Sequence, residues 1–443
     1  MTDAAHLFGR SLPRMTSAGP NGPRTRALVD TLARYECPGL TARRRRREEL
    51  SGAPHDPIVW ARASGGNVED ADGNVYVDLT GGFGVALLGH ALPTVVAAVQ
   101  SQAGRLLHAL GDVSPSREKI ALEAALAALV PWPARVILGV SGADAVEAAL
   151  KTARLATGRA GIVAFEGGYH GLSYGALAAC GYREAFRAPF AGQLNPSVRF
   201  VPYPSAESAE RSLSSLREAL ADGSVGAVLL EPVLGRGGVV VAPDAALRAV
   251  AAATREAGAL FLADEIYTGL RRTGPWFRSV AAGCEPDVVV TGKALGGGLP
   301  VSAAIVREDV AQAWGDCAGE AIHTSTFLGN PMAAAAALAV LEALHGSDAE
   351  SALAGCAANF AAALDAPLRG VRSVVTAGLL LGVALDGGSR RALAVCRTLL
   401  EAGYIVLTGG AAGDVLTLTP PACLTSAQID AFVAALRDAL DRS

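Results

Sequence analysis

The chain has 443 residues, with 38 basic and 42 acidic side chains and a formal net charge of -4. This balance gives no reason to expect a nucleic-acid partner. The length allows two or three domains with a large core. Apolar residues make up 51% of the chain, but the most apolar stretch, residues 333–341, is well short of the roughly 20 residues that a membrane span requires. We therefore expect no membrane span.

The cysteines are scattered, odd in number and form no Cys-x-x-Cys pair. This pattern indicates reduced thiols in a cytoplasmic protein, because a disulfide frame or a zinc site needs paired spacing. The histidines have no metal-ligand spacing either. The cysteines are Cys37, Cys180, Cys284, Cys317, Cys356, Cys396 and Cys423.

Residues 1–22 are rich in Ser, Pro, Gly and Thr and lack the apolar core of a secretory signal, so we predict a flexible N-terminal arm. Residues 23–75 are predicted to pack with a small domain. Within them, residues 24–50 are compatible with a helix and contain the run Arg43 to Arg47. Such a run could bind phosphate or an acidic surface, but we favour a solvated helix face paired partly with Glu48 and Glu49.

From residue 67, a turn at Asp72-Gly73 is followed by an alternating strand, which predicts a hairpin. Residues 76–335 are predicted to form a large domain. There, residues 135–140 read as a strand, Ser141-Gly142-Ala143 as its turn and residues 144–157 as a helix. A turn of small residues that opens a helix presents free backbone N–H groups to an anion. Neither familiar nucleotide loop is present, so a single phosphate monoester is the expected anion.

Three apolar runs each end in one reactive residue: 225–230 before Glu231, 259–263 before Asp264, and 288–290 before Thr291-Gly292-Lys293. Runs without alternation are typical of strands that are covered on both faces of a parallel sheet. In such sheets, ligands bind beyond the carboxyl ends of the strands. We therefore expect an α/β fold in which these three side chains share one site.

The remainder of the chain predicts a smaller α+β domain over residues 336–443. A helix should begin at Pro331 with Asn330 as its N-cap. Strands are expected at residues 378–385 and 415–418, and a closing helix at residues 426–440.

The candidate residues match the needs of one cofactor. A lysine in an apolar setting is partly neutral and can form a Schiff base with an aldehyde, as Lys293 could. Asp264 could hold a proton on a ring nitrogen, and Tyr169 offers an aromatic face to the ring. Together with a phosphate site, these features specify pyridoxal 5′-phosphate (PLP).

Three strings carry a resemblance to a known family. Residues 262–269 read Leu-Ala-Asp-Glu-Ile-Tyr-Thr-Gly, residues 291–300 read Thr-Gly-Lys-Ala-Leu-Gly-Gly-Gly-Leu-Pro, and residues 325–331 read Ser-Thr-Phe-Leu-Gly-Asn-Pro. In this order they resemble the class III (omega) aminotransferases, PLP enzymes of fold type I. Shorter matches extend the resemblance from about residue 67 to the C-terminus: Asp72-Gly73-Asn74, Gly89-His90, Ser141-Gly142-Ala143-Asp144-Ala145, Tyr169-His170-Gly171, Glu231-Pro232 and Pro420-Pro421.

The resemblance implies a large domain with a mostly parallel central sheet flanked by helices, and a ping-pong transfer of an amino group. Lys293 would be the Schiff-base lysine and proton carrier, and Asp264 would pair with the pyridinium nitrogen. Ile266 would pack under the ring and Tyr169 over it. Thr326 would reach the phosphate of the neighbouring subunit, so the site would require a homodimer. The cofactor-binding residues expected are Ser141, Gly142, Ala143, Tyr169, His170, Glu231, Asp264, Ile266, Tyr267, Lys293 and Thr326.

Departures from the family pattern concern the substrate. Relatives that act on carboxylated amines often carry arginine where this chain has Leu172 and Thr417. A missing guanidinium fork weakens carboxylate binding, so we expect either a substrate group without a carboxylate there or a carboxylate held elsewhere, with Arg236 as a candidate. Tyr267 replaces a common glutamine and could still hydrogen-bond near the ring hydroxyl.

Two further expectations remain open from the sequence. A Leu234 in place of the family's glutamine would make one wall of the pocket more apolar. Phe83 is a candidate to line the same pocket, although we favour a buried core aromatic. The same family includes aminomutases and amino-acid racemases or epimerases, which use the same lysine and aspartate. A PLP-dependent isomerase is therefore the alternative to an aminotransferase.

Overall fold

The computed structural model describes residues 8–52, 57–315 and 319–443. Cys317 and the first seven residues of the predicted arm lie outside this range. Contacts divide the chain into two units, Pro93–Ala349 and a second unit made of Met1–Leu92 with Glu350–Ser443. The domain limits predicted from the sequence stay a prediction.

The unit Pro93–Ala349 is built on a seven-stranded sheet in the order β4-β12-β11-β10-β7-β5-β6. Only β12 runs antiparallel to its neighbours, so the sheet is mostly parallel, as predicted. The three apolar runs form the adjacent strands β7, β10 and β11. The strands are β4 (Ala134–Gly139), β5 (Gly161–Phe165), β6 (Val198–Val201), β7 (Val225–Leu230), β10 (Leu260–Asp264), β11 (Val288–Thr291) and β12 (Ser302–Arg307).

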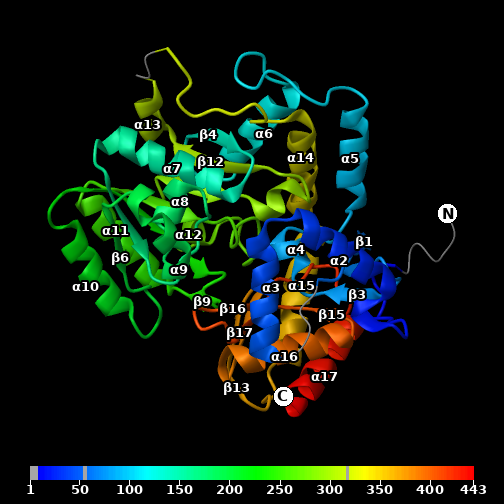
Figure 1. Cartoon of the computed structure of the whole chain (residues 1–443). Helices are drawn as coiled ribbons and strands as arrows, with labels where there is room; N and C mark the ends of the chain where they lie inside the picture. Colours follow the sequence, from blue (N-terminus) through cyan, green and yellow to red (C-terminus); the bar gives the residue numbers. More distant parts are fainter. Residues whose placement is uncertain (1–7, 53–56, 316–318) are drawn as a thin grey trace. The chain divides into compact units, whose positions relative to one another are not determined.

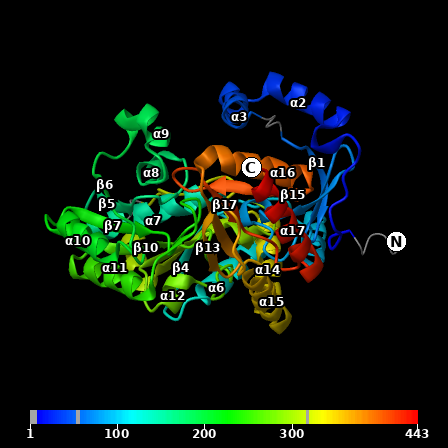
Figure 2. The ribbon, with the colours of Figure 1, turned by 90° about the horizontal axis from the view of Figure 1, so that it is seen from below.

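Helices cover both faces of this sheet. On one face, α10 (Ala209–Leu220) and α11 (Asp244–Glu256) lie side by side and pack on alternate strand residues such as Val228 and Leu230 (Figures 1 and 2). On the other face, α7 (Gly142–Thr157) packs on the intervening residues such as Ala227 and Leu229. Because successive strand side chains point to opposite faces, an unbroken apolar run supplies both cores.

Shorter elements complete this unit. Helix α14 begins at Pro331 as predicted, and the Asn330 side chain accepts from the backbone N–H groups of Met332 and Ala333. The other elements are α5 (Pro93–Ala103), α6 (Arg117–Ala127), α8 (Tyr174–Ala178), α9 (Glu184–Arg187), η2 (Ala188–Gln193), β8 (Val233–Leu234), β9 (Val240–Val241), α12 (Arg278–Ala281), η3 (Lys293–Gly296), α13 (Glu308–Ala311), η4 (Gln312–Trp314) and α14 (Pro331–His345).

The second unit contains two four-stranded sheets, β1-β2-β3-β15 and β13-β14-β17-β16. Parallel pairing of β3 with β15 joins residues 75–78 to the C-terminal segment. The predicted hairpin is formed by β2 and β3, and the predicted strand 415–418 is β17. The strands are β1 (Trp60–Ser64), β2 (Asn67–Asp70), β3 (Val75–Asp78), β13 (Val371–Ala377), β14 (Leu380–Leu385), β15 (Tyr404–Ile405), β16 (Leu407–Gly409) and β17 (Val415–Leu418).

The helices of the second unit are η1 (Gly19–Asn21), α2 (Pro23–Tyr35), α3 (Pro38–Ser51), α4 (Gly81–Gly84), α16 (Gly388–Glu401) and α17 (Ser426–Arg442). Helix α15 (Ser347–Ala363) runs across the division between the units. None of the described helices combines the length and the apolar character that a membrane crossing needs.

The helix-compatible stretch 24–50 forms two helices, because Pro38 begins a new helix after a break at Glu36 and Cys37. The expectation that Phe83 is buried was wrong, because its side chain is 67% exposed. Its backbone adopts a positive φ of 63° within the glycine-rich turn 81–84.

The arginine run lies on α3, a helix without buried residues, as a solvated face would. Arg44 of the run forms an ion pair with Glu36, which precedes the helix.

Candidate functional site

The carboxyl ends of β7, β10 and β11 place the three predicted reactive residues at one edge of the sheet. Ala263 is in register with Leu230, and Asp264 is in register with Val290. Glu231, Asp264 and the segment that leads to Lys293 therefore lie at the same end of three adjacent strands. Asp264 and Glu231 are both buried, with exposed fractions of 3% and 4%. The sheet therefore gathers two carboxylates and an amine at the edge where parallel sheets bind ligands.

Asp264 is held by a histidine from another loop. The Asp264 Oδ2 atom lies 2.7 Å from Nδ1 of His170, and its Oδ1 atom accepts from the N–H of Ile266 at 3.1 Å. Burial by itself lowers the pKa of His170, but the hydrogen bond and negative charge of Asp264 outweigh it and raise the pKa. The bond to His170 therefore holds the Asp264 carboxyl group in a fixed orientation.

Glu231 ties two loops together. Its Oε1 atom accepts from the N–H of Tyr169 at 2.7 Å and its Oε2 atom from the N–H of Gly235 at 3.1 Å. Burial, followed by the charge of Asp264, raises the pKa of Glu231 to about 7. Glu231 thus fixes the positions of Tyr169 and of the segment after β8.

Lys293 lies over the ring of Tyr267, with its Nζ atom 3.8 Å from the ring centroid. Desolvation by the surrounding protein lowers the pKa of Lys293 to about 8, although Asp264 and Glu231 act in the opposite direction. Lys293 also has a positive φ of 39°, a backbone strain that the fold imposes at this position. At neutral to slightly alkaline pH a substantial fraction of this amine is neutral and nucleophilic.

The Tyr267 ring rests on a glycine. A Cβ atom added to Gly235 would lie 1.9 Å from Cδ1 of Tyr267, so no other residue fits beneath the ring without displacing it. Gly235, whose N–H is bound by Glu231, therefore packs directly against the Tyr267 ring that contacts Lys293.

The predicted anion turn lies beside these residues. Ser141 is the N-cap of α7, and its side chain accepts from the N–H of Asp144. Gly142 and Ala143 lie in the first turn of the helix, where backbone N–H groups have no acceptor within the helix. The Ile266 side chain fills the space between Gly142 and Gly292: a Cβ atom on these glycines would lie 3.0 Å and 3.6 Å from its carbon atoms. Ile266 thus connects the anion turn with the segment that carries Lys293.

These residues fit PLP. Among the described residues, the buried Nε2 atom of His170 and Oγ1 atom of Thr291 have no hydrogen-bond partner, which leaves polar capacity beside the aspartate and the lysine. The anion turn, the carboxylate and the desolvated amine match the phosphate, the ring nitrogen and the aldehyde of the cofactor.

Thr326 is exposed, in the loop that precedes α14, and its predicted role requires a second subunit. This assignment, like those of the other site residues, stays a prediction.

The sequence did not identify the aromatic cluster beside the site. Leu177, Cys180 and Tyr182 form a small buried cluster against which Tyr169 and Phe186 pack. The ring centroids of Tyr169 and Tyr182 are 6.2 Å apart, with the rings nearly perpendicular. The recurring aromatic residues between 169 and 190 were the available signal, but it did not indicate which rings would meet.

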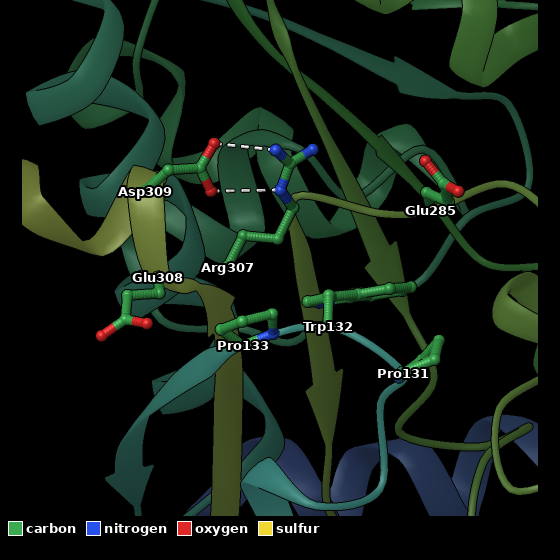
Figure 3. A pocket seen from close by; sticks show the side chains of 7 residues that line it. All are labelled: Pro131, Trp132, Pro133, Glu285, Arg307, Glu308 and Asp309. Atoms are coloured by element: carbon green, nitrogen blue, oxygen red, sulfur yellow. Dashed lines mark hydrogen bonds and ion pairs between the residues drawn. The ribbon is translucent and has the colours of Figure 1, made fainter.

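A pocket also exists at the opposite edge of the sheet. It is lined by residues that precede β4 and β11, by the last residue of β12 and by the two residues after it, namely Pro131, Trp132, Pro133, Glu285, Arg307, Glu308 and Asp309. Figure 3 shows the guanidinium of Arg307 paired with the carboxylate of Asp309. None of the predicted site residues lines this pocket.

Comparisons with known proteins give a family match and curated relatives. The family model described as aminotransferase class-III matches residues 51–440. The chain is 39% identical over 388 residues to an acetylornithine aminotransferase of Mycolicibacterium smegmatis, an alignment that covers 87% of this chain and 94% of the relative. It is 35% identical over 453 residues to a diaminobutyrate–2-oxoglutarate aminotransferase of Rhizobium meliloti, with 94% and 95% covered.

The chain also resembles a solved transaminase structure. The fold matches an amine transaminase from an uncultivated Pseudomonas species in the PLP-bound form with a TM-score of 0.79 and 27% identity, over 88% of this chain and 95% of that one.

Proposed function

Because the chain belongs to the class-III aminotransferases and is therefore a PLP-dependent enzyme that transfers amino groups in a ping-pong reaction, we propose that Lys293 and Asp264 are its catalytic residues. The observation that carries this proposal is the shared sheet edge, where a desolvated amine and a histidine-bound carboxylate follow adjacent strands. The fold and cofactor agree with the prediction from the sequence.

Each residue has a role that its contacts support. Bound PLP supplies an aldehyde and an electron-withdrawing ring. Lys293 would capture the aldehyde and afterwards carry a proton on its Nζ atom, which a pKa of about 8 makes easy to gain and lose. Asp264, oriented by His170, would hold the ring nitrogen.

The remaining proposed contacts position the cofactor. Gly142 and Ala143 would donate backbone N–H groups to the phosphate from the first turn of α7, next to Ser141. Ile266 and Tyr169 would pack on the two faces of the ring, and Tyr267 would lie beside the ring hydroxyl.

We propose a primary amine at the end of a short carbon chain as donor and a 2-oxo acid as acceptor. The names of the relatives support this choice, since acetylornithine and diaminobutyrate both carry such an amine and one name includes 2-oxoglutarate. The isomerase alternative has no support from these names.

A homodimer is also proposed, with Thr326 contributed to the partner's phosphate site. Two neighbouring loops expose apolar side chains: the rings of His108 and Phe327 are 5.5 Å apart, and Asn330 donates to the carbonyl of Leu107. Exposed apolar patches mark interaction surfaces. The exposed large apolar residues of these loops are Leu106, Leu107, Leu110, Val113, Ile322 and Phe327.

We place the enzyme in the cytoplasm. Cys180 and Cys284 are buried free thiols, and a reducing compartment keeps such thiols reduced.

A half-reaction tests the proposed function. The PLP-loaded enzyme is mixed with N-acetylornithine, 2,4-diaminobutyrate and simple amines without acceptor, and its visible spectrum is recorded. We expect the visible band of the lysine-bound cofactor to be lost with at least one terminal amine and restored by 2-oxoglutarate. A donor that is racemised or rearranged, with no amino group delivered to any oxo acid, would instead establish the isomerase.

A further inference from the structure

Arg236 is held at the tip of a short hairpin next to the site. Strands β8 and β9 pair Val233 with Val241 and Leu234 with Val240, and residues 235–239 form the connection. The connection is fixed by the bond from Gly235 N–H to Glu231 and by the contact of Gly235 with Tyr267. The residue after Gly235 is therefore presented from a rigid position.

The guanidinium of Arg236 is stacked on two tyrosines. Its Cζ atom lies 4.4 Å from the ring centroid of Tyr169 and 5.2 Å from that of Tyr182. Both rings are themselves fixed, since the Tyr169 N–H is bound to Glu231 and Tyr182 is 6% exposed. Stacking on aromatic faces holds a guanidinium plane in place and leaves its N–H edge available.

Arg236 has no carboxylate partner among the described residues. Within residues 8–52, 57–315 and 319–443, it forms no ion pair or hydrogen bond, and its side chain is half-buried. Arg199, Arg278 and Arg307, by contrast, each pair with an aspartate. A partly desolvated guanidinium without a counter-ion is a site for an anion.

The position of Arg236 also indicates which anion. Its positive charge is one of those that lower the pKa of Lys293, so it lies within electrostatic range of the reactive amine. The phosphate of the cofactor is accounted for by the turn at the start of α7. The remaining anion of the reaction is the carboxylate of an oxo acid or amino acid.

We propose that Arg236 binds the substrate carboxylate and thereby replaces the arginine that is absent at Leu172. The preferred substrates would then be oxo acids and amino acids rather than simple amines. This inference rests on the proposed function and assigns a substrate class to its site. The planar fork of Arg236 matches the two oxygens of a carboxylate, and the stacked tyrosines set its plane before substrate binds.

Binding of an unreactive probe tests the inference separately from turnover. Glutarate carries carboxylates but no amino or oxo group, and its binding to the PLP-loaded enzyme can be followed by calorimetry and by the near-ultraviolet difference spectrum of the tyrosines. We expect Arg236→Gln to weaken glutarate binding about 10- to 100-fold, the range for a lost charge-assisted hydrogen-bond pair. The neutral glutaramide should bind neither protein measurably.

Two further variants separate recognition from structure. Arg236→Lys keeps the charge but loses the fork, so its KM for 2-oxoglutarate should lie between those of wild type and Arg236→Gln, with kcat little changed. Arg183 is the matched control, since its Cζ atom stacks 4.9 Å from the same Tyr182 ring but its side chain is exposed. Arg183→Gln should leave glutarate binding within about twofold, as expected for an exposed charge.

The outcomes are distinct. Equal glutarate affinity in wild type and a folded Arg236→Gln would overturn the assignment, even if amino transfer proceeds normally. If the wild-type enzyme transfers an amino group from none of the donors, the proposed function is overturned, whatever its affinity for glutarate. If Arg236→Gln fails to fold, an unchanged KM in Arg236→Lys would count against the assignment.

Discussion

The two edges of the seven-stranded sheet hold similar charged side chains in opposite environments. At the carboxyl ends of β7 and β10, Glu231 and Asp264 are at most 4% exposed. At the other edge, the side chains of Arg307 and Asp309 pair at 2.7 Å but are 31% and 66% exposed (Figure 3). Solvent screens the pair of Arg307 and Asp309. At the carboxyl ends of the strands, in contrast, desolvation raises the pKa of Glu231 and lowers that of Lys293. Chemistry therefore depends on the surroundings of the charges and not on their number.

The largest effect is expected for Lys293→Ala. Removal of the nucleophile and proton carrier should lower kcat at least about 10³-fold, because general acid–base and covalent catalysis act through one group. The variant should also lack the visible band of lysine-bound PLP. Arg307→Gln, at the opposite edge, is the control and should retain wild-type kcat; a large loss there would show that both edges serve the reaction.

A smaller effect is expected for Gly235→Ala. The new Cβ atom would overlap the Tyr267 ring, so the ring must move away from Lys293 and kcat should fall roughly 10-fold, as for modest misplacement of a reacting group. The double variant Gly235→Ala with Tyr267→Gln removes the overlap and should be more active than Gly235→Ala alone. Additive losses in the double variant would show that the two residues are not coupled.

The pH dependence of stability should differ between the two edges. The pKa of Glu231 is raised from 4.5 to about 7 in the folded protein, so the folded state binds the extra proton between these values. Stability from this group is present at pH 4.5 and below and is lost as pH rises through 7. Relative to Glu231→Gln, the Tm of wild-type apoenzyme should fall between pH 5.5 and pH 8; parallel Tm curves would contradict the raised pKa.

Lys293 should act in the opposite sense at higher pH. Its pKa falls from 10.5 to about 8 on folding, so its contribution to stability is present above pH 10.5 and is lost as pH falls through 8. The Tm of wild-type apoenzyme should therefore rise between pH 8 and pH 10 relative to Lys293→Ala.

The smallest effect is expected at the exposed edge. Arg307→Gln removes surface ion pairs, which typically contribute no more than about 1 kcal/mol to the free energy of unfolding. Its Tm should stay close to that of wild type across the same pH range. A Tm change that corresponds to much more than about 1 kcal/mol would mean that the exposed pair stabilises the fold more than its exposure indicates.

Local signals were sufficient for much of the fold. The runs 225–230 and 288–290 predicted strands because buried parallel strands need apolar side chains on both faces. Asn330-Pro331 predicted the start of α14 because the cap and the fixed φ act within a few residues. Family motifs named Lys293 and Asp264 in the same way, from residues close together in the chain.

The tertiary structure decided which distant groups meet. His170 binds Asp264 across 94 residues of sequence, and no local pattern selects that partner from the other histidines. Gly235 beneath Tyr267, and Arg236 over Tyr169, result from the way that loops converge beyond the strands. Phe83 was predicted wrongly for the same reason, since burial depends on what packs against a residue and not on its own hydrophobicity. The sequence alone determined the strands and the reactive groups that follow them, because short-range geometry governs both; the tertiary structure determined their partners and pKa values, because long-range packing sets distance and desolvation.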